Sequence, residues 1–370
     1  MAAQDCCRAT SLLTPFHPSQ IPAVITSLQS IFRTSPEPWG AAMRRRTFIE
    51  GIAVLAAAWP LAVRAQQSAM PVIGFLGSSS AGPYAGRLRY FHQGLNETGF
   101  TEGQNVAIDY RWAEEQYDRL PALAAQLVQH QVALIVAAGG TPSAVATKAA
   151  TATIPIIFAV GIDPVTAGLV SSLNRPGGNV TGVTNLNLEV GPKRLELMRE
   201  LLPSATVIAL LVNQTNPIIT ESVVRSLQAA ASRLGLKLHI VSASTEREID
   251  KAFTAVAQVG AGALIVGTDT FFNSQSEHIA TLSVRHAIPT IFQYRPFVAA
   301  GGLLSYGSDE TEYYRLVGVY AGRILKGEKP ADLPVQRSTK VELIINLKTA
   351  RALGLTVPMS LLGRADEVIE

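Results

Sequence analysis

Short apolar segments rich in Val, Ile and Leu recur along the chain, and each is bounded by Gly, Pro, Asn or Asp. Segments of this length and composition predict β-strands. Some of them, such as 134–137 and 208–212, are apolar at every position, which is typical of central strands in a parallel sheet that helices cover on both faces. The eleven predicted strands are 72–77, 106–111, 133–138, 154–160, 180–184, 207–212, 237–242, 263–267, 289–294, 302–306 and 341–345.

Amphipathic stretches at helical spacing separate these strands. In segment 120–128, for example, Leu120, Leu123 and Leu127 share one apolar stripe. A further helix is predicted for 193–202. Strands that alternate with helices of this length predict βαβ units and parallel sheets.

The alternation runs once from 72 to 184 and again from 207 to 294, and each series is long enough to form its own sheet. We therefore expect two similar α/β lobes, joined around 179–187 and separated by a cleft. In open α/β sheets the ligand binds beyond the carboxyl ends of the strands, so the residues that follow each strand are the candidates for a site.

Met43 begins a segment with the layout of a secretory signal peptide. Three arginines precede an apolar run at 51–62, and Val63-Arg64-Ala65 then resembles a cleavage site. The run is too short to span a bilayer, which needs about 20 residues. The pair Arg45-Arg46 also fits a twin-arginine (Tat) signal, so the choice between the general (Sec) and Tat export routes stays open. A buried N-terminal helix is the less favoured alternative.

A signal peptide works at the start of a chain, so we interpret residues 1–42 as a start-site artefact and residues 43–65 as the signal peptide. Removing 1–65 takes away six of the 31 basic and three of the 28 acidic residues, as well as both cysteines. The remaining chain has no net formal charge. This does not indicate a nucleic-acid partner, because phosphate binding requires clustered Lys and Arg.

Small polar residues follow the strands of the first series. Ser78 follows the first strand, and Gly139-Gly140-Thr141 follows the third at the start of a helix. Backbone N–H groups at a helix start favour a carboxylate or phosphate, although a helix start without a ligand is the plain alternative. Asp163 follows the fourth strand, where it either caps the next turn or holds a ligand ammonium group.

Polar and aromatic residues follow the strands of the second series. Asn213 and Asp269 come after two of its strands, and aromatic residues are enriched there although they make up only 6% of the chain. Pockets for small molecules combine aromatic walls with a few fixed polar groups. Phe271 and Tyr294 are therefore candidates, as is Tyr84 in the first series. Packing in the core is the competing interpretation for Phe271.

The sequence after residue 65 lacks the patterns of common catalytic sites. It has no Gly-x-Ser-x-Gly motif and no cysteine, and it has neither a dinucleotide-binding glycine motif nor a Walker motif. Its five histidines do not have metal-ligand spacing. We therefore expect no catalytic residue, no metal and no cofactor.

The chain from residue 71 to 370 resembles the periplasmic substrate-binding proteins of ABC importers, in particular the tryptophan/tyrosine-type group. The motifs that carry this resemblance are Pro-Val-Ile-Gly-Phe-Leu at 71–76, Gly-Gln-Asn-Val at 103–106, Tyr-Asp-Arg-Leu-Pro at 117–121, Leu-Asn-Arg-Pro-Gly-Gly-Asn-Val-Thr-Gly at 173–182, Ser-Tyr-Gly at 305–307 and Gly-Glu-Lys-Pro-Ala-Asp-Leu-Pro-Val at 327–335.

The resemblance implies the type I periplasmic-binding fold, in which two doubly wound parallel-sheet lobes are joined by a hinge of three crossings. Lobe 1 is expected to contain 71–184 and 303–326, and lobe 2 to contain 186–301 and 329–370. The resemblance also implies that the ligand lies between the lobes. The expected contacts are Ser78, Tyr84, Thr141, Asp163, Asn185, Asn213, Asp269, Phe271 and Tyr294.

Within this set, Thr141 would hold a carboxylate and Asp163 or Asp269 an amino group, while Tyr84, Phe271 and Tyr294 would face an apolar part. The expected function is an exported, monomeric periplasmic protein that binds a small molecule, by default an aromatic or other amino acid. It would deliver this ligand to an inner-membrane permease that a separate ATPase powers.

Two alternatives remain. One is a binding protein that feeds a signalling receptor, and the other, less favoured, is an exported α/β enzyme. A sugar-responsive repressor shares the fold but requires an N-terminal helix-turn-helix where the signal peptide stands.

Overall fold

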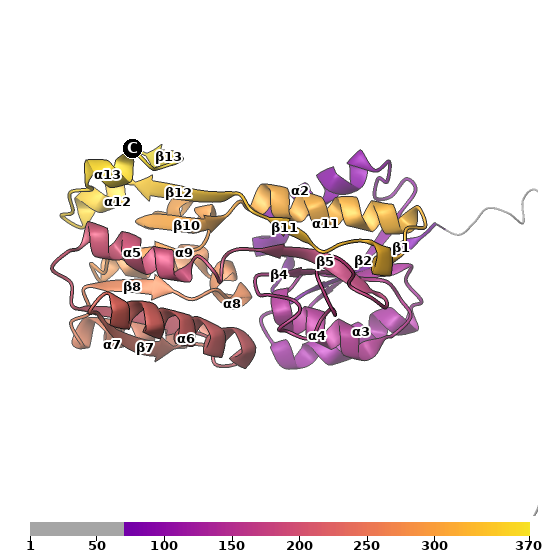
Figure 1. Ribbon diagram of the computed structural model, residues 1–370, viewed down its shortest axis with the longest axis horizontal. Coiled ribbons are helices and arrows are strands. Elements are labelled where there is room, and N and C mark those ends of the chain that lie inside the picture. Colours follow the sequence, from indigo (N-terminus) through magenta and orange to yellow (C-terminus); the bar gives the residue numbers. More distant parts are fainter. Residues whose placement is uncertain (1–69) are drawn as a thin grey trace, which may run out of the picture. The chain divides into compact units, whose positions relative to one another are not determined.

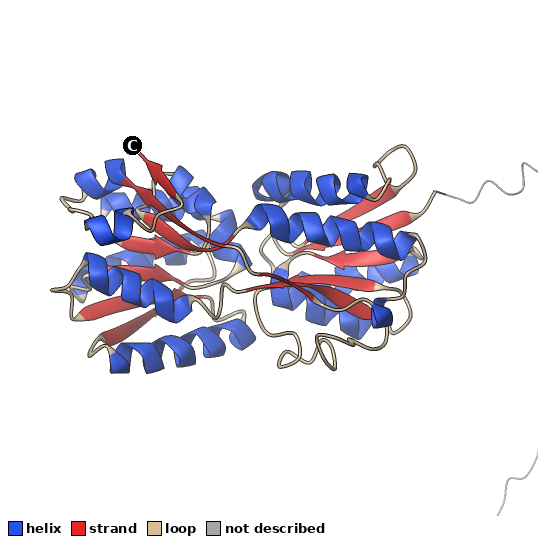
Figure 2. Cartoon of the chain, turned by 45° about the horizontal axis from the view of Figure 1, so that its top comes forward, coloured by secondary structure: helices blue, strands red, loops and turns tan. Residues whose placement is uncertain are grey.

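The computed structural model describes residues 70–370, which fold into two α/β lobes. The predicted signal peptide at 43–65 and the segment 1–42 lie outside the described residues. A central, mainly parallel sheet with helices on both faces forms the framework of each lobe (Figures 1 and 2). All eleven predicted strands are present, with ends that differ by up to two residues.

The first lobe contains a six-stranded sheet in the order β11-β5-β4-β3-β1-β2, and all of its pairings are parallel. Its strands are β1 (Val72–Gly77), β2 (Ala107–Trp112), β3 (Leu134–Ala137), β4 (Ile156–Val160), β5 (Val180–Asn185) and β11 (Gln336–Ser338). Its helices are α2 (Ala81–Glu97), α3 (Leu120–Gln129), α4 (Gly140–Ala150) and α11 (Glu310–Leu325), with short 3-10 turns η1 (Tyr117–Arg119) and η2 (Pro330–Asp332).

The second lobe contains a seven-stranded sheet in the order β13-β12-β10-β9-β8-β6-β7. Its strands are β6 (Val207–Val212), β7 (Lys237–Ser242), β8 (Ala263–Val266), β9 (Thr290–Phe292), β10 (Leu304–Ser308), β12 (Val341–Asn346) and β13 (Glu367–Ile369). Its helices are α5 (Gly191–Leu201), α6 (Pro217–Arg233), α7 (Glu246–Gln258), α8 (Thr270–Ser274), α9 (Ser276–Arg285), α10 (Arg295–Ala299), α12 (Leu347–Ala352) and α13 (Met359–Leu362). The pairing of β10 with β12 is antiparallel, so β12 and β13 run against the rest of this sheet.

The chain passes between the lobes three times, after β5, after β10 and after β11. Two of the expected lobe boundaries are corrected by this topology. Strand β10 was expected in lobe 1 but pairs with β9 and β12 of lobe 2, and only α11 returns to the first lobe. Strand β11 was expected in lobe 2 but pairs with β5 of lobe 1. The crossings therefore lie between β10 and α11 and between β11 and β12.

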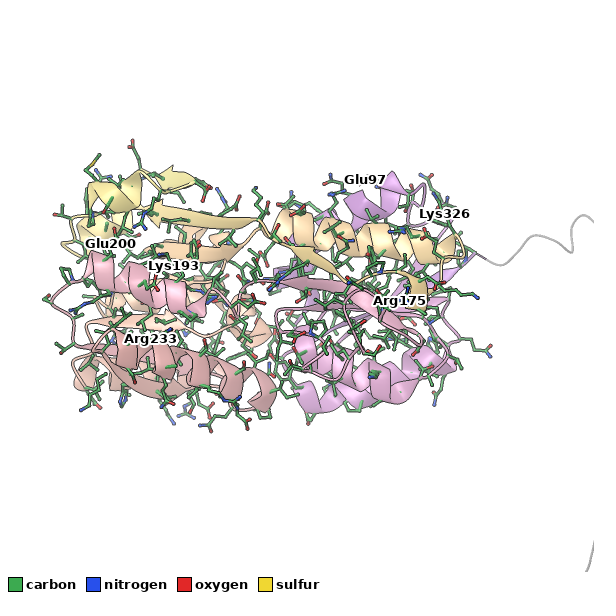
Figure 3. The ribbon with its side chains drawn as sticks, viewed as in Figure 1. Glu97, Arg175, Lys193, Glu200, Arg233 and Lys326 are labelled. Carbon is green, nitrogen blue, oxygen red and sulfur yellow. The ribbon has the colours of Figure 1, made fainter. Side chains whose placement is uncertain are left out.

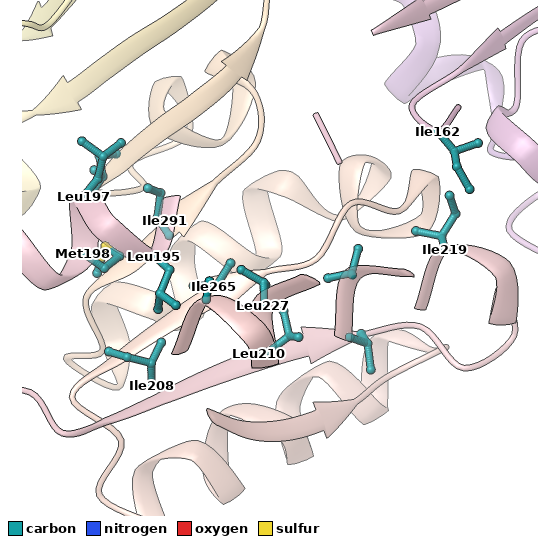
Figure 4. Packing of buried hydrophobic residues seen from close by; sticks show 14 of the residues in the cluster. Ile162, Leu195, Leu197, Met198, Ile208, Leu210, Ile219, Leu227, Ile265 and Ile291 are labelled. Carbon is teal, nitrogen blue, oxygen red and sulfur yellow. The ribbon is translucent and has the colours of Figure 1, made fainter. Parts of the chain in front are cut away.

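Buried aliphatic side chains fill the space between each sheet and its helices. In the second lobe, Leu195 of α5 and Leu227 of α6 pack over Leu210 and Ile265 of the sheet (Figure 4). The same cluster continues into the first lobe through Ile162, which lies near Ile219 of α6. The apolar core thus extends across the junction of the two lobes. It helps to hold them together in this arrangement.

Charged side chains lie mainly on the outer surfaces of the helices and loops, as Figure 3 shows for Glu97, Arg175, Arg233 and Lys326. Among residues 70–370, no helix combines the length and the apolar character that crossing a membrane requires.

Candidate functional site

The carboxyl ends of the strands of one lobe face those of the other, and the polar residues predicted from the sequence meet there. Ser78 of lobe 1 donates its hydroxyl hydrogen to Thr270 Oγ1 of lobe 2 across 3.0 Å. The Asn185 side-chain amide at the end of β5 donates to the Tyr294 hydroxyl after β9 across 3.2 Å. The structure therefore brings Ser78, Asn185 and Tyr294 to one interface between the lobes.

Glycine residues allow the two edges to approach this closely. Within lobe 1, a Cβ on Gly139 would lie 2.3 Å from the backbone nitrogen of Ser78, so no side chain fits at the end of β3. Across the junction of the lobes, a Cβ on Gly140 would lie 3.4 Å from Thr270 Cγ2, and one on Gly161 would lie 3.8 Å from Thr268 Cγ2. Because lobe 1 and lobe 2 atoms are in near contact here, the arrangement is a closed one.

Tyr117 of the turn η1 reaches from lobe 1 into lobe 2 and was not predicted from the sequence. Its hydroxyl donates to Asp269 Oδ1 across 2.9 Å and lies 2.8 Å from Thr270 Oγ1. It also lies 3.2 Å from the backbone nitrogen of Phe271. The Tyr117 hydroxyl thus joins lobe 1 to the amino-terminal end of α8.

Asp269 is the most heavily hydrogen-bonded carboxylate at this interface. Besides Tyr117, it accepts hydrogen bonds from the side-chain amides of Asn213 and Asn216, both at 2.9 Å, and from the Phe271 backbone nitrogen at 3.0 Å. Burial raises the pKa of Asp269 above its ordinary value, and these donors oppose that shift. A carboxylate has about four acceptor positions, so a ligand ammonium would have to displace a protein donor from it.

Asp163, in contrast to Asp269, is exposed, and its carboxylate is hydrogen-bonded within its own turn. It accepts hydrogen bonds from the Val165 backbone nitrogen at 3.0 Å and the Thr166 hydroxyl at 2.7 Å. The Thr166 hydrogen bond lowers the pKa of Asp163. Of the two interpretations that the sequence left open, the structure displays the capping of the following turn.

Aromatic side chains and one buried arginine form a cluster beside the Asn185–Tyr294 contact. Tyr84 is fully buried; its hydroxyl donates to the carbonyl of Ala138 and lies 2.9 Å from that of Tyr314. The Arg87 guanidinium carbon lies 5.1 Å from the Tyr84 ring centre and 6.0 Å from that of Tyr294. Such distances are those of cation–π contacts.

Arg87 also forms an ion pair of 2.8 Å with Glu310 of α11, and both side chains are largely buried. Sequence analysis missed Arg87 because it comes from a helix rather than from a strand end. Phe271 is 4% exposed and packs against Phe272 with ring centres 5.5 Å apart, within the core of lobe 2.

Several buried polar atoms at the strand ends and at the first crossing have no hydrogen-bond partner in residues 70–370. In lobe 1 they are the hydroxyls of Ser79 and of Thr141, which lies in the first turn of α4. On the first crossing the unpartnered atom is Asn187 Nδ2, and in lobe 2 they are Arg194 Nε and Gln293 Oε1. Buried polar atoms are normally hydrogen-bonded, so unpartnered ones at a cleft indicate room for a ligand or water.

A groove of about 1080 Å³ leads into the interface from one face. Its lobe 1 wall includes Arg87 of α2 and Glu310 of α11, and its lobe 2 wall includes Asn273 and Gln293. In the part of the chain that the structure describes, no three His, Cys, Asp or Glu side chains come together in a way that could hold a metal ion.

The sequence of this chain is similar to those of known proteins. Residues 86–369 match the family described as ABC transporter substrate binding protein. A protein named "Tyrosine-binding protein" from Clostridioides difficile (strain R20291) is 33% identical over 267 residues, which are 72% of this chain and 75% of that protein.

Two solved structures are similar over 81% of this chain and 99% of their own chains. One is a complex with L-Trp from "Streptococcus pneumonia", at 30% identity and a TM-score of 0.73. The other is the ligand-free, open structure of a substrate-binding protein with adhesive properties from Clostridium difficile, at 28% identity and a TM-score of 0.57. With its two parallel-sheet lobes and three crossings, the chain belongs to the family of ABC transporter substrate-binding proteins.

Proposed function

We propose that this chain is the exported solute-binding component of an ABC importer and that it captures an aromatic amino acid between its lobes. The names of its relatives support the ligand class, since one is called a tyrosine-binding protein and another was solved with L-Trp. The predicted signal peptide at 43–65 supports export to the periplasm.

The observation that carries this proposal is the set of hydrogen bonds that join the lobes at their strand ends. Ser78, Tyr117 and Asn185 each bond to a residue of the opposite lobe or strand end. The chain also superimposes better on the L-Trp complex than on the ligand-free, open structure. Both facts support a hinged protein and indicate that the present arrangement of its lobes is the closed form.

A ligand favours closure only as far as it binds the closed form more tightly than the open one. Moving the populations from 1:99 to 99:1 requires about 5.5 kcal/mol of differential binding. A buried charge contact, several hydrogen bonds and an aromatic wall supply energies of this order. Ser78, Thr141, Asn185, Asn213 and Tyr294 are the proposed contacts.

The closed protein then docks on an inner-membrane permease powered by a separate ATPase, and the ligand leaves chemically unchanged. The test is a thermal-shift panel of the twenty amino acids on the purified protein, with the compound recovered afterwards. We expect L-tyrosine, L-tryptophan or L-phenylalanine to give the largest rise in melting temperature and to be recovered intact. Conversion of the bound compound, or no shift with any of the three, contradicts the proposal.

A further inference from the structure

The groove between the lobes is larger than a single amino acid requires. Its volume is about 1080 Å³, slightly more than the roughly 300–1,000 Å³ of pockets that hold drug-sized molecules. Its lobe 1 wall is formed mainly by α2, and its lobe 2 wall includes parts of α8, α10, β10 and β12. None of the ligand contacts proposed above lines it, so the groove is space in addition to them.

Two residues of the groove connect it to the proposed ligand contacts. Gln293 directly precedes Tyr294 in the chain, and the Arg87 guanidinium carbon lies 6.0 Å from the Tyr294 ring centre. Tyr294 is itself one of the proposed contacts. A ligand held there therefore has a path into the groove while the lobes stay closed.

Glycine residues of α2 keep the lobe 1 wall free of side chains. Gly86 lies in the middle of α2, and Gly82 lies four residues earlier on the same side of the helix. Glycine is unfavourable inside a helix, yet nothing lies within 4 Å of a Cβ position at either residue. Gly94 of the same helix differs, because a Cβ there would meet the backbone of Arg315 in α11. Packing thus accounts for Gly94 but not for Gly82 and Gly86, which leave the groove open.

The lobe 2 wall also presents small side chains, those of Ser274, Ser276, Ala299 and Ala300. Most charged side chains of the groove are paired with one another. The pairs are Arg87–Glu310 at 2.8 Å, Arg295–Glu367 at 2.6 Å and Lys340–Asp309 at 2.9 Å. The groove therefore does not favour a ligand with a large net charge of either sign.

Gln293 offers an unused hydrogen-bond acceptor to the groove. It is fully buried, and its Oε1 has no partner among residues 70–370. Its Nε2 donates to Asn273 Oδ1 across 2.6 Å, and Asn273 also lines the groove. Two side-chain amides joined in this way leave one acceptor, Gln293 Oε1, beside one donor, Asn273 Nδ2. A peptide group carries one N–H donor and one C=O acceptor, so it matches this pair.

We propose that the groove accepts a second residue joined by a peptide bond to the aromatic amino acid, so that the ligands of this chain include aromatic dipeptides. The inference rests on the proposed function and extends its ligand class, and it leaves the contacts to the aromatic amino acid unchanged. The peptide group lies against Gln293 and Asn273, and the second residue lies along the glycine face of α2. Gly82 and Gly86 are then specificity-determining residues.

The test compares L-tyrosine with the dipeptides Ala-Tyr and Tyr-Ala by calorimetric titration of the purified protein. The wild type should bind at least one dipeptide with an affinity within about tenfold of that for L-tyrosine. Gly86→Leu places a side chain in the groove, so it should weaken the binding of that dipeptide at least about tenfold and that of L-tyrosine less than about twofold. Because a Cβ at Gly86 meets nothing within 4 Å, this variant should fold.

Two further variants separate occupation of the groove from a general effect on α2. Ala85→Leu adds the same side chain at a neighbouring exposed position that does not line the groove, and it should leave all affinities unchanged. Gln293→Met removes the free acceptor and should weaken the dipeptide about three- to tenfold relative to L-tyrosine.

The outcomes distinguish this inference from the proposed function. Binding of L-tyrosine but of neither dipeptide overturns the inference and leaves the proposed function intact. Dipeptide binding that Gly86→Leu does not reduce also overturns it, because the second residue then lies elsewhere. Binding of a dipeptide alone supports the inference and contradicts only the free amino acid as ligand, whereas failure of all three compounds to bind contradicts both.

Discussion

The Tyr117 hydroxyl of lobe 1 donates a hydrogen bond of 2.9 Å to the Asp269 carboxylate of lobe 2. The two residues are 152 positions apart in the chain. Opening of the cleft would separate them, whereas the other three donors to Asp269 all belong to lobe 2. The contact therefore distinguishes the closed arrangement from an open one.

Tyr117→Phe should weaken ligand binding without weakening either lobe. The loss of a hydrogen bond to a charged group costs about 1.5–3 kcal/mol, so we expect the affinity for the aromatic ligand to fall about tenfold or more. Small-angle scattering should show a larger unliganded radius of gyration than in the wild type.

Tyr320→Phe is the matched control, because the Tyr320 hydroxyl donates to the Pro334 carbonyl within lobe 1. It should lower the melting temperature and leave the affinity unchanged. If both variants alter affinity equally, Tyr117 has no special role in closure.

Asp269→Asn should destabilise the second lobe. The new amide hydrogens would face the donors of Asn213 or Asn216 in a buried site, and one of these groups would lose its acceptor. Leaving a buried group unsatisfied costs about 1–3 kcal/mol, which a urea unfolding curve measures. Asp163→Asn, at an exposed capping position, should cost less than about 1 kcal/mol. Equal costs would show that burial does not govern the difference.

Gly139→Ala should be strongly destabilising, because its Cβ would lie 2.3 Å from the Ser78 backbone nitrogen. The strand ends β1 and β3 would have to separate, and overpacking of this kind costs about 1–3 kcal/mol. Gly86→Ala in α2 is the contrast, since nothing lies within 4 Å of its Cβ position. That change should raise stability by up to about 1 kcal/mol through helix propensity. A neutral Gly139→Ala would show that the two strand ends are not held this closely.

Much of the fold was predictable from the sequence, because apolar strands such as β3 and β6 have a composition that few other elements share. Strands β11 and β13 were missed, since each has only three residues and β11 (Gln-Arg-Ser) is entirely polar. Strand β10 was assigned to the wrong lobe because sequence order does not show where the chain crosses.

The site was predictable only in part, for a similar reason. Residues that directly follow strands, such as Ser78 and Tyr294, could be selected from the sequence because parallel strands end at a common edge. Arg87 and Tyr117 come from a helix and a turn, and only tertiary packing brings them to the junction of the lobes. Their residue types, an arginine and a tyrosine, are also those of ordinary surface residues.

The buried tyrosines should make the protein sensitive to alkaline pH. Burial raises the pKa values of Tyr84, Tyr117, Tyr313 and Tyr314, and raises the pKa of Tyr294 to about 12. In the unfolded chain these groups ionise near pH 10. The folded form therefore keeps its protons longer, so stability is complete below about pH 10 and falls as the pH rises toward 12.

An absorbance titration of tyrosinate followed alongside circular dichroism checks this. The five groups should ionise only as the secondary structure is lost. If all nine tyrosines of the chain titrate near pH 10 while the fold persists, the cluster is not buried as described.

The most direct measurement for the account as a whole is a calorimetric titration of the purified protein with L-tyrosine and L-tryptophan, with sucrose as a control solute. The account predicts saturable binding of one aromatic amino acid per chain, with a negative heat-capacity change from the surface that closure buries. Heat from sucrose but from neither amino acid, or no saturable heat at all, would contradict it.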